Sequence, residues 1–220
     1  MVGAPANTGP TSEEIQESIR VASRKMNHGD GKGCLADLDR LKAIAPSTEA
    51  TLVYLRAQCE MLGGSCQAGK QRLVTHMRVE TNAHIDRANA TAEAMAAMYC
   101  RGGDATDRDR LLGALQELVT AAYSETRTPE QCRATVATIR SLLPTVKPRD
   151  VDDHQVANAD KSLYATAPGC FARAGDCASA WQLHRELFPQ ENLKNVDSKV
   201  RADVLASTFD SLVPRCKGKR

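Results

Sequence analysis

The chain has 220 residues, with 29 Lys plus Arg against 27 Asp plus Glu and a formal net charge of +2. This balance argues against a nucleic-acid-binding protein, which usually carries a basic excess on one face, and the 42% apolar content excludes global disorder. No apolar run approaches about 18 residues, so no membrane span is expected in this segment. Residues 1–10 hold prolines and glycines, predict a flexible leader or linker, and lack the pattern of a signal peptide.

The rest of the chain predicts an all-α fold. Aromatic residues make up only 4% of the chain, and no stretch shows the alternation typical of a strand. Residues that favour helices recur at helical spacing between Gly and Pro stops. We expect a single domain over 11–214, with similar halves at about 11–124 and 129–214 and a basic tail at 215–220. The ten expected helices cover about 12–28, 34–45, 47–61, 65–79, 84–100, 107–123, 129–143, 152–174, 176–188 and 197–213.

Eight cysteines mark an internal repeat. Four lie at expected helix starts, and apolar or histidine residues follow seven positions later. The other four lie near helix ends, so the order is start, end, start, end, twice over. This order predicts a duplicated arrangement. The helix-start cysteines are Cys34, Cys66, Cys132 and Cys177, the residues seven positions later are Leu41, Leu73, Ile139 and His184, and the helix-end cysteines are Cys59, Cys100, Cys170 and Cys216.

Two segments of the chain resemble tetratricopeptide repeats. One runs from Gly29-Asp30 through Leu38 and Leu41 to Pro46, and the other from Gly175-Asp176 through Ala180 and Leu187 to Pro189, with Phe171 four residues before its glycine. The resemblance implies antiparallel helix pairs with Gly-Asp at the turn, stacked into a superhelical solenoid. The Trp and Gly usual in the family's first helix are not in place, and the 32 residues from Cys100 to Cys132 break the period. An irregular helical-hairpin relative is the alternative.

The cysteine pattern predicts four disulfides. No Cys-x-x-Cys pair occurs, which argues against structural zinc and a thioredoxin-type centre, and eight reduced, buried thiols are the less favoured alternative. If neighbouring helices are antiparallel, the start of one lies beside the end of the next. This favours a ladder of Cys34–Cys59, Cys66–Cys100, Cys132–Cys170 and Cys177–Cys216. The rival pairing closes each turn locally, as Cys59–Cys66 and Cys170–Cys177, and leaves Cys34–Cys100 and Cys132–Cys216.

Disulfides of this number imply a periplasmic or extracellular protein. Because no signal peptide is present, we expect this chain to be a segment of a longer or processed protein.

No catalytic or metal-binding pattern is found, so we expect neither an enzyme nor a cofactor or metal. The five histidines lack metal-ligand spacing and are interpreted as surface or helix-terminal, and Trp181 as a core residue. Asp104, Asp107 and Asp109 lack the spacing of a calcium loop and are expected to cap helices. The histidines are His28, His76, His84, His154 and His184.

An all-α solenoid without a catalytic constellation is best explained as a protein-interaction or scaffold module that binds a protein or peptide. In the family that the chain resembles, the first helix of each repeat lines a concave surface. If this carries over, Tyr54, Gln58 and Glu93 face the partner. The alternatives are a structural spacer of an envelope assembly or the sensor portion of a larger signalling protein.

Overall fold

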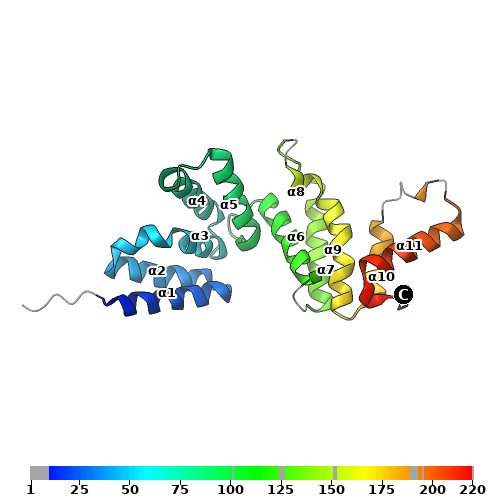
Figure 1. Cartoon of the computed structure of the whole chain (residues 1–220), viewed down its shortest axis with the longest axis horizontal. Helices are drawn as coiled ribbons and strands as arrows, with labels where there is room; N and C mark the ends of the chain where they lie inside the picture. Colours follow the sequence, from blue (N-terminus) through cyan, green and yellow to red (C-terminus); the bar gives the residue numbers. More distant parts are fainter. Residues whose placement is uncertain are drawn as a thin grey trace, which may run out of the picture. The chain divides into compact units, whose positions relative to one another are not determined.

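A computed structural model describes residues 10–100, 102–123, 127–150, 153–188, 193–194 and 196–219. Every regular element in these residues is helical, which confirms the all-α class (Figure 1). Eleven α-helices and two short 3₁₀ segments are found there, and consecutive helices pack in an antiparallel manner. None of the described helices is both long and apolar enough to cross a membrane.

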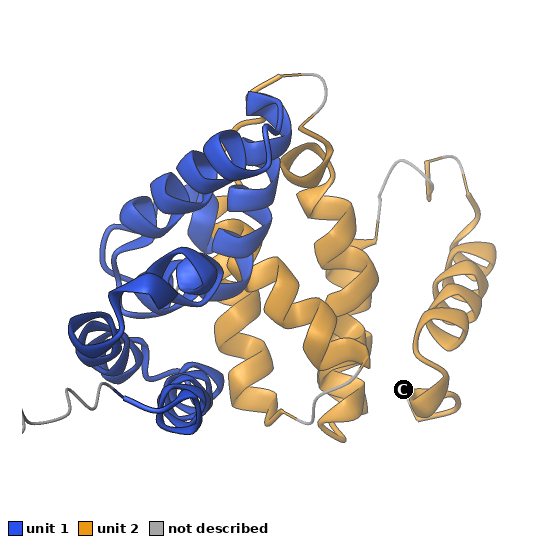
Figure 2. Cartoon of the chain, turned by 60° about the vertical axis from the view of Figure 1, so that its left-hand side comes forward, with its two compact units in different colours: residues 1–110 blue, residues 111–220 orange. Residues whose placement is uncertain are grey.

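The chain divides into two compact units, residues 1–110 and 111–220 (Figure 2). The division falls inside α6, earlier than the expected junction of the halves at 124–129. Unit 1 contains α1 (Ser12–Asn27), α2 (Gly31–Ile44), η1 (Pro46–Leu52), α3 (Val53–Leu62), α4 (Cys66–Glu80), α5 (Ile85–Tyr99) and the start of α6 (Asp107–Tyr123). Unit 2 contains the rest of α6, then α7 (Pro129–Leu142), α8 (His154–Ala157), α9 (Ala159–Arg173), α10 (Cys177–Leu187), α11 (Ser198–Leu212) and η3 (Pro214–Cys216).

In the structure, two of the ten expected helices are each divided into two shorter elements. The segment 47–61 opens as the 3₁₀ turn η1, which begins at Pro46, and becomes α-helical only at Val53. The segment 152–174 breaks at Asn158, which separates α8 from α9. The second expected helix also begins earlier than predicted, at Gly31, because the Asp30 carboxylate accepts a hydrogen bond from the backbone N–H of Gly33 and caps it.

Three helix turns share one geometry. In each turn a glycine with positive φ follows the end of a helix: Gly29 (78°) after α1, Gly64 (94°) after α3 and Gly175 (84°) after α9. Each glycine N–H donates to a carbonyl three residues earlier, at 2.9, 3.2 and 3.2 Å, and the next residue donates to a carbonyl five residues earlier at 2.8 to 2.9 Å. This is a Schellman-type helix end, in which only glycine adopts the left-handed conformation readily. Asp30, Ser65 and Asp176 follow these glycines and stand at the N-caps of α2, α4 and α10.

The four disulfides form the ladder pairing. Each joins a cysteine near the start of one helix to a cysteine in the last turns of the next long helix or shortly after it, with Cα–Cα distances of 5.4 to 5.9 Å. No described cysteine is free. Four disulfides indicate an oxidising, extracytoplasmic environment. The pairs are Cys34–Cys59, Cys66–Cys100, Cys132–Cys170 and Cys177–Cys216.

The positions of the cysteines within their helices recur in the two units. In α2 and α7 the cysteine is the fourth helical residue, and in α4 and α10 it is the first. The pair α2 and α4 in unit 1 therefore corresponds to the pair α7 and α10 in unit 2. The residues seven positions after each helix-start cysteine are all buried, which gives the four helices a common inward face. They are Leu41, Leu73, Ile139 and His184.

Candidate functional site

Helix α4 has a buried face and an exposed face. Gly69, Leu73 and Met77 recur every four residues and are buried. A Cβ on Gly69 would lie 2.7 Å from the Ala57 carbonyl oxygen, so the glycine allows α4 to approach α3 closely. The opposite face carries the exposed residues Gln71 and Thr75. This exposed face is the centre of the candidate site in unit 1.

Two hollows flank that face. One, of about 700 Å³, lies between α4 and the start of α5 and includes Val74, Arg78 and Ile85. The other, of about 560 Å³, lies on the flank of α4 that faces α3 and includes Val53, Arg72 and His76. The two hollows share Gln71, Thr75 and Val79, whose side chains therefore lie between them.

Helix α10 repeats this arrangement in unit 2. A hollow of about 290 Å³ faces α7 and α9, and another of about 660 Å³ faces Arg201 and Leu205 of α11. Gln182 and Glu186 line both. On each helix, one hollow lies toward the helix or helices that precede it in the chain: toward α3 for α4, and toward α7 and α9 for α10. These two hollows are lined by the residues at the same four positions after the helix-start cysteine, namely the second, fifth, sixth and ninth. These are Ala68, Gln71, Arg72 and Thr75 on α4, and Ser179, Gln182, Leu183 and Glu186 on α10.

The shared glutamine makes the same contact in both units. The Gln71 amide lies 3.3 Å from the hydroxyl of Thr75, and the Gln182 amide donates to the carboxylate of Glu186 at 2.9 Å. Arg140 of α7 also donates to Glu186, and these two hydrogen bonds, that from Arg140 foremost, hold the pKa of Glu186 below its usual range. Both glutamines are exposed, so each can exchange its intramolecular contact for one to a ligand.

The residues predicted to bind a partner lie on α3 and α5. Tyr54 is 40% exposed and packs edge-on against His76, whose ring lines a hollow of α4. Gln58 lies one turn further along α3 and is half-buried. Glu93 does not project freely from α5, because its carboxylate lies 3.1 Å from Arg108 Nε and 3.7 Å from Lys70 Nζ. The structure brings Tyr54 close to the hollows, and the binding role of all three residues stays a prediction.

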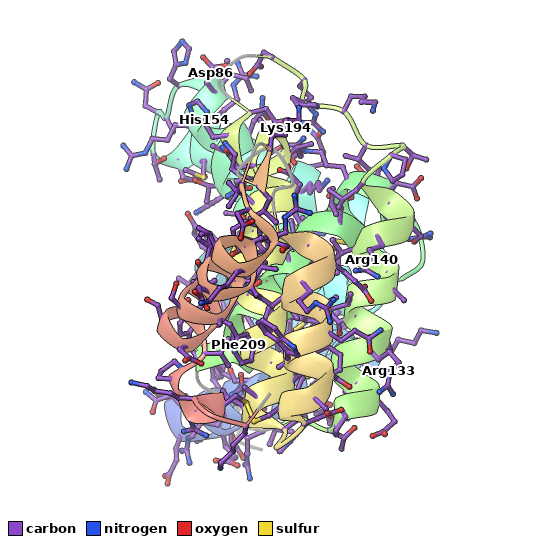
Figure 3. The ribbon with its side chains drawn as sticks, turned by 90° about the vertical axis from the view of Figure 1, so that its right-hand side faces the viewer. Asp86, Arg133, Arg140, His154, Lys194 and Phe209 are labelled. Atoms are coloured by element: carbon purple, nitrogen blue, oxygen red, sulfur yellow. A yellow bond between two sulfur atoms is a disulfide. The ribbon has the colours of Figure 1, made fainter. Side chains whose placement is uncertain are left out.

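His184 lies in the last turn of α10, as the helix-terminal interpretation predicts, but it is not a surface residue. Its ring is fully buried, with Nε2 3.1 Å from the Leu205 carbonyl oxygen, and burial lowers its pKa. It lies within ring contact of Trp181 and Phe209. Trp181 was expected in the core, but it is only half-buried and sits at the edge of this cluster. Figure 3 shows Phe209 on α11. One feature of the sequence could have indicated that His184 is buried. It lies seven residues after Cys177, the position that the buried Leu73 holds after Cys66 on α4.

The acidic residues after α5 act as structural groups. Asp104 accepts hydrogen bonds from the backbone N–H groups of Cys66 and Gln67, so it caps α4. Asp109 accepts from the N–H and hydroxyl of Thr106 at the start of α6 and pairs with Lys70. Asp109 is buried; burial would raise its pKa, but these hydrogen bonds together lower it.

No group of three or more metal-ligating side chains is found in the described part of the chain. No protein family, curated protein or solved structure matches this chain. The functional argument therefore depends on the geometry of α4 and α10.

Proposed function

We propose that this chain is a non-catalytic protein-interaction module that holds segments of a partner protein against the exposed faces of α4 and α10. The observation that carries the proposal is the recurrence of paired hollows around an exposed glutamine on two equivalent helices. Two helices that pack in the same way need to resemble each other only at their buried positions. Matching surface positions are not required for folding, so their recurrence supports a shared role in binding.

The chemistry of the hollows suits a protein segment. In unit 1 they include apolar side chains, and Val79 between them is 72% exposed. Exposed apolar side chains rimmed by polar groups are typical of protein-binding surfaces. In unit 2 they include Trp181 and Arg185, and these residue types are enriched at the energetic centres of interfaces. The exposed glutamine amides supply a donor and an acceptor for a peptide backbone.

The resemblance to tetratricopeptide repeats is further support for a binding role. The helices that precede the shared Gly turns in unit 1 are α1 and α3, and α3 contacts both α1 and α5. In the family, helices in this position line a concave surface. Binding there would use Tyr54 and Gln58 on α3 rather than Gln71 on α4. The disulfides support a periplasmic or extracellular site of action. As part of the proposal, the module acts within an envelope complex there.

A peptide selection with matched variants tests the proposal. A displayed library of random 12-residue peptides is selected on the intact, oxidised protein, and enriched peptides are synthesised for affinity measurement. Gln71→Trp and Gln182→Trp fill the surface between each pair of hollows. Gln16→Trp, at an exposed glutamine on α1, is the matched control. We expect each site variant to weaken binding of some selected peptides at least tenfold, and the control to leave all affinities unchanged.

Other outcomes overturn the proposal. If Gln58→Trp abolishes binding while the two site variants do not, the binding surface is the face of α3. If selection on the protein enriches no peptide above a blank surface, the alternative of a structural spacer or sensor portion is favoured. Unfolding midpoints of every variant show whether a loss of binding reflects loss of the fold.

A further inference from the structure

The charges around the hollows are unbalanced. In unit 2 the arginines Arg133, Arg140, Arg185 and Arg201 line the two hollows of α10, against the single carboxylate of Glu186. In unit 1 the hollows of α4 include Arg72 and Arg78 against Glu80. The formal net charge of the whole chain is only +2, so these surfaces are more basic than the chain as a whole.

Four of these six arginines form no ion pair in the part of the chain that the structure describes. They are Arg78, Arg133, Arg185 and Arg201, whereas Arg72 pairs with Glu60 and Arg140 with Glu186. Arg133 nevertheless lies close enough to Glu130 and Asp176 to help lower the pKa of both carboxyls. Arg185 lies 6.0 Å from the centre of the Trp181 ring, and Arg201 donates to the Leu193 carbonyl oxygen at 3.2 Å. These contacts orient the two guanidinium groups without neutralising them.

The arginines lie on both sides of α10. Arg133 and Arg140 both come from α7 (Figure 3). They line the hollow on one side of Gln182. Arg185 and Arg201 line the hollow on its other side. Between the arginines, the hollows include the apolar residues Val136, Phe171, Leu183 and Leu205. A segment laid across α10 would meet cations at both flanks and apolar side chains in the hollows.

We infer that the partner segment is acidic, with carboxylates that flank apolar anchors, and that the chain binds two such segments, one at α4 and one at α10. The inference rests on the proposed function and adds the chemistry of the partner. Guanidinium groups bind carboxylates through two parallel hydrogen bonds, and the charge complementarity raises the association rate. The site on α10, which has more unpaired arginines, depends more strongly on this charge.

The apolar lining favours a protein segment over a sulfated or phosphorylated polymer. Such polymers present charge at every unit and no apolar side chain to fill a hollow. A single-stranded nucleic acid would also need several aromatic stacking platforms, and among the described residues the α10 hollow that faces α11 includes one aromatic side chain, that of Trp181.

The test compares charge reversal at the site with charge reversal elsewhere. Arg133→Glu/Arg185→Glu changes the α10 site, and Arg215→Glu/Lys219→Glu, at exposed residues of the same unit, is the control with an equal charge change. Arg78→Glu and Arg87→Glu form the corresponding pair in unit 1. The probes are synthetic 12-residue peptides from the selection described above, their variants with every Asp and Glu replaced by Lys, and heparin.

We expect the enriched peptides to carry a net negative charge. We also expect Arg133→Glu/Arg185→Glu to weaken binding at the α10 site about tenfold or more, the control to change it less than threefold, and the Lys-replaced peptides to bind the reversed variant better than the wild type. If the enriched peptides are neutral or basic and yet depend on Gln71 and Gln182, the inference is wrong and the proposed function stands. Heparin binding that is sensitive to the same arginines, without peptide binding, would overturn both.

Discussion

Gln182 on α10 repeats the position and the side-chain contact of Gln71 on α4. Each glutamine lies five residues after a disulfide-bonded cysteine, and each places its amide within hydrogen-bond distance of the side chain four residues later. The ninth residue after the cysteine differs, Thr75 in one unit and Glu186 in the other, but it lies beside both hollows in each. The two helices thus share the position of the glutamine and of the hollows beside it, as well as the buried position seven residues after the cysteine.

Loss of the last disulfide should destabilise unit 2. Cys177 and Cys216 close a loop with a sequence separation of 39, and the chain-entropy estimate for such a loop is about 4 kcal/mol of unfolding free energy. We expect Cys177→Ala/Cys216→Ala to lower the denaturation midpoint, measured by the fluorescence of Trp181, the single tryptophan. Because the variant already lacks this bridge, reductant should lower its midpoint by less than that of the wild type. An unchanged midpoint would show that the bridge does not stabilise the unit.

His184 should make the stability of unit 2 depend on pH. Its usual pKa is 6.5, and burial lowers this value in the folded protein, so between the two values the unfolded state binds more protons. The contribution of neutral His184 to the unfolding free energy should therefore be fully present above about pH 6.5. The unfolding free energy should fall as the pH drops below that value, by at most about 1.4 kcal/mol per pH unit.

His184→Leu should remove this pH dependence, because Leu73 occupies the equivalent position of α4. The measurement is the urea midpoint of Trp181 fluorescence between pH 5 and 8 for the wild type and the variant. Parallel pH profiles of the two proteins would assign the pH dependence to other groups.

Gly69 should not tolerate a side chain. A Cβ there would lie 2.7 Å from both the Ala57 carbonyl oxygen and Met61 Cγ, which would push α4 away from α3. We expect Gly69→Ala to cost about 1–3 kcal/mol, as overpacking does in other cores. Gly102→Ala, with nothing within 4 Å of the new Cβ, is the control and should be neutral or slightly stabilising. Thermal unfolding of both variants gives the comparison, and equal midpoints would contradict the close approach of the two helices.

The buried pair of Asp109 and Lys70 should be sensitive to loss of one charge. Asp109 is 1% exposed, and if its carboxylate is removed, the one acidic side chain left beside Lys70 among the described residues is Glu93, at 3.7 Å. We expect Asp109→Asn to destabilise the protein by about 3–5 kcal/mol, the range seen when one partner of a buried pair is lost. Asp86→Asn, at an exposed carboxylate beside His84, should change stability by less than about 0.5 kcal/mol. Similar chemical denaturation curves for the two variants would contradict this account.

The helix positions and the disulfide ladder could be predicted because both depend on local signals. Gly and Pro mark the helix ends, and the cysteines fall at helix starts and ends in an order that antiparallel packing can join. The break at Asn158 was not predicted, because no Gly or Pro lies there to signal it.

The candidate site was harder to predict. Gln71 and Gln182 are ordinary exposed residues, and only the three-dimensional equivalence of α4 and α10 marks them. Glu93 was expected to face outward, but Lys70 and Arg108 come from other helices, and helical periodicity does not reveal such partners.

The central claim is that α4 and α10 each hold one partner segment, and the stoichiometry of binding tests it most directly. Isothermal titration of the intact, oxidised protein with a selected peptide whose binding both Gln71→Trp and Gln182→Trp weaken should give two peptides per chain. Gln71→Trp and Gln182→Trp should each reduce this number to one, and the double variant should bind none. Two peptides still bound by the double variant, or a single peptide whose binding neither substitution affects, would contradict the account.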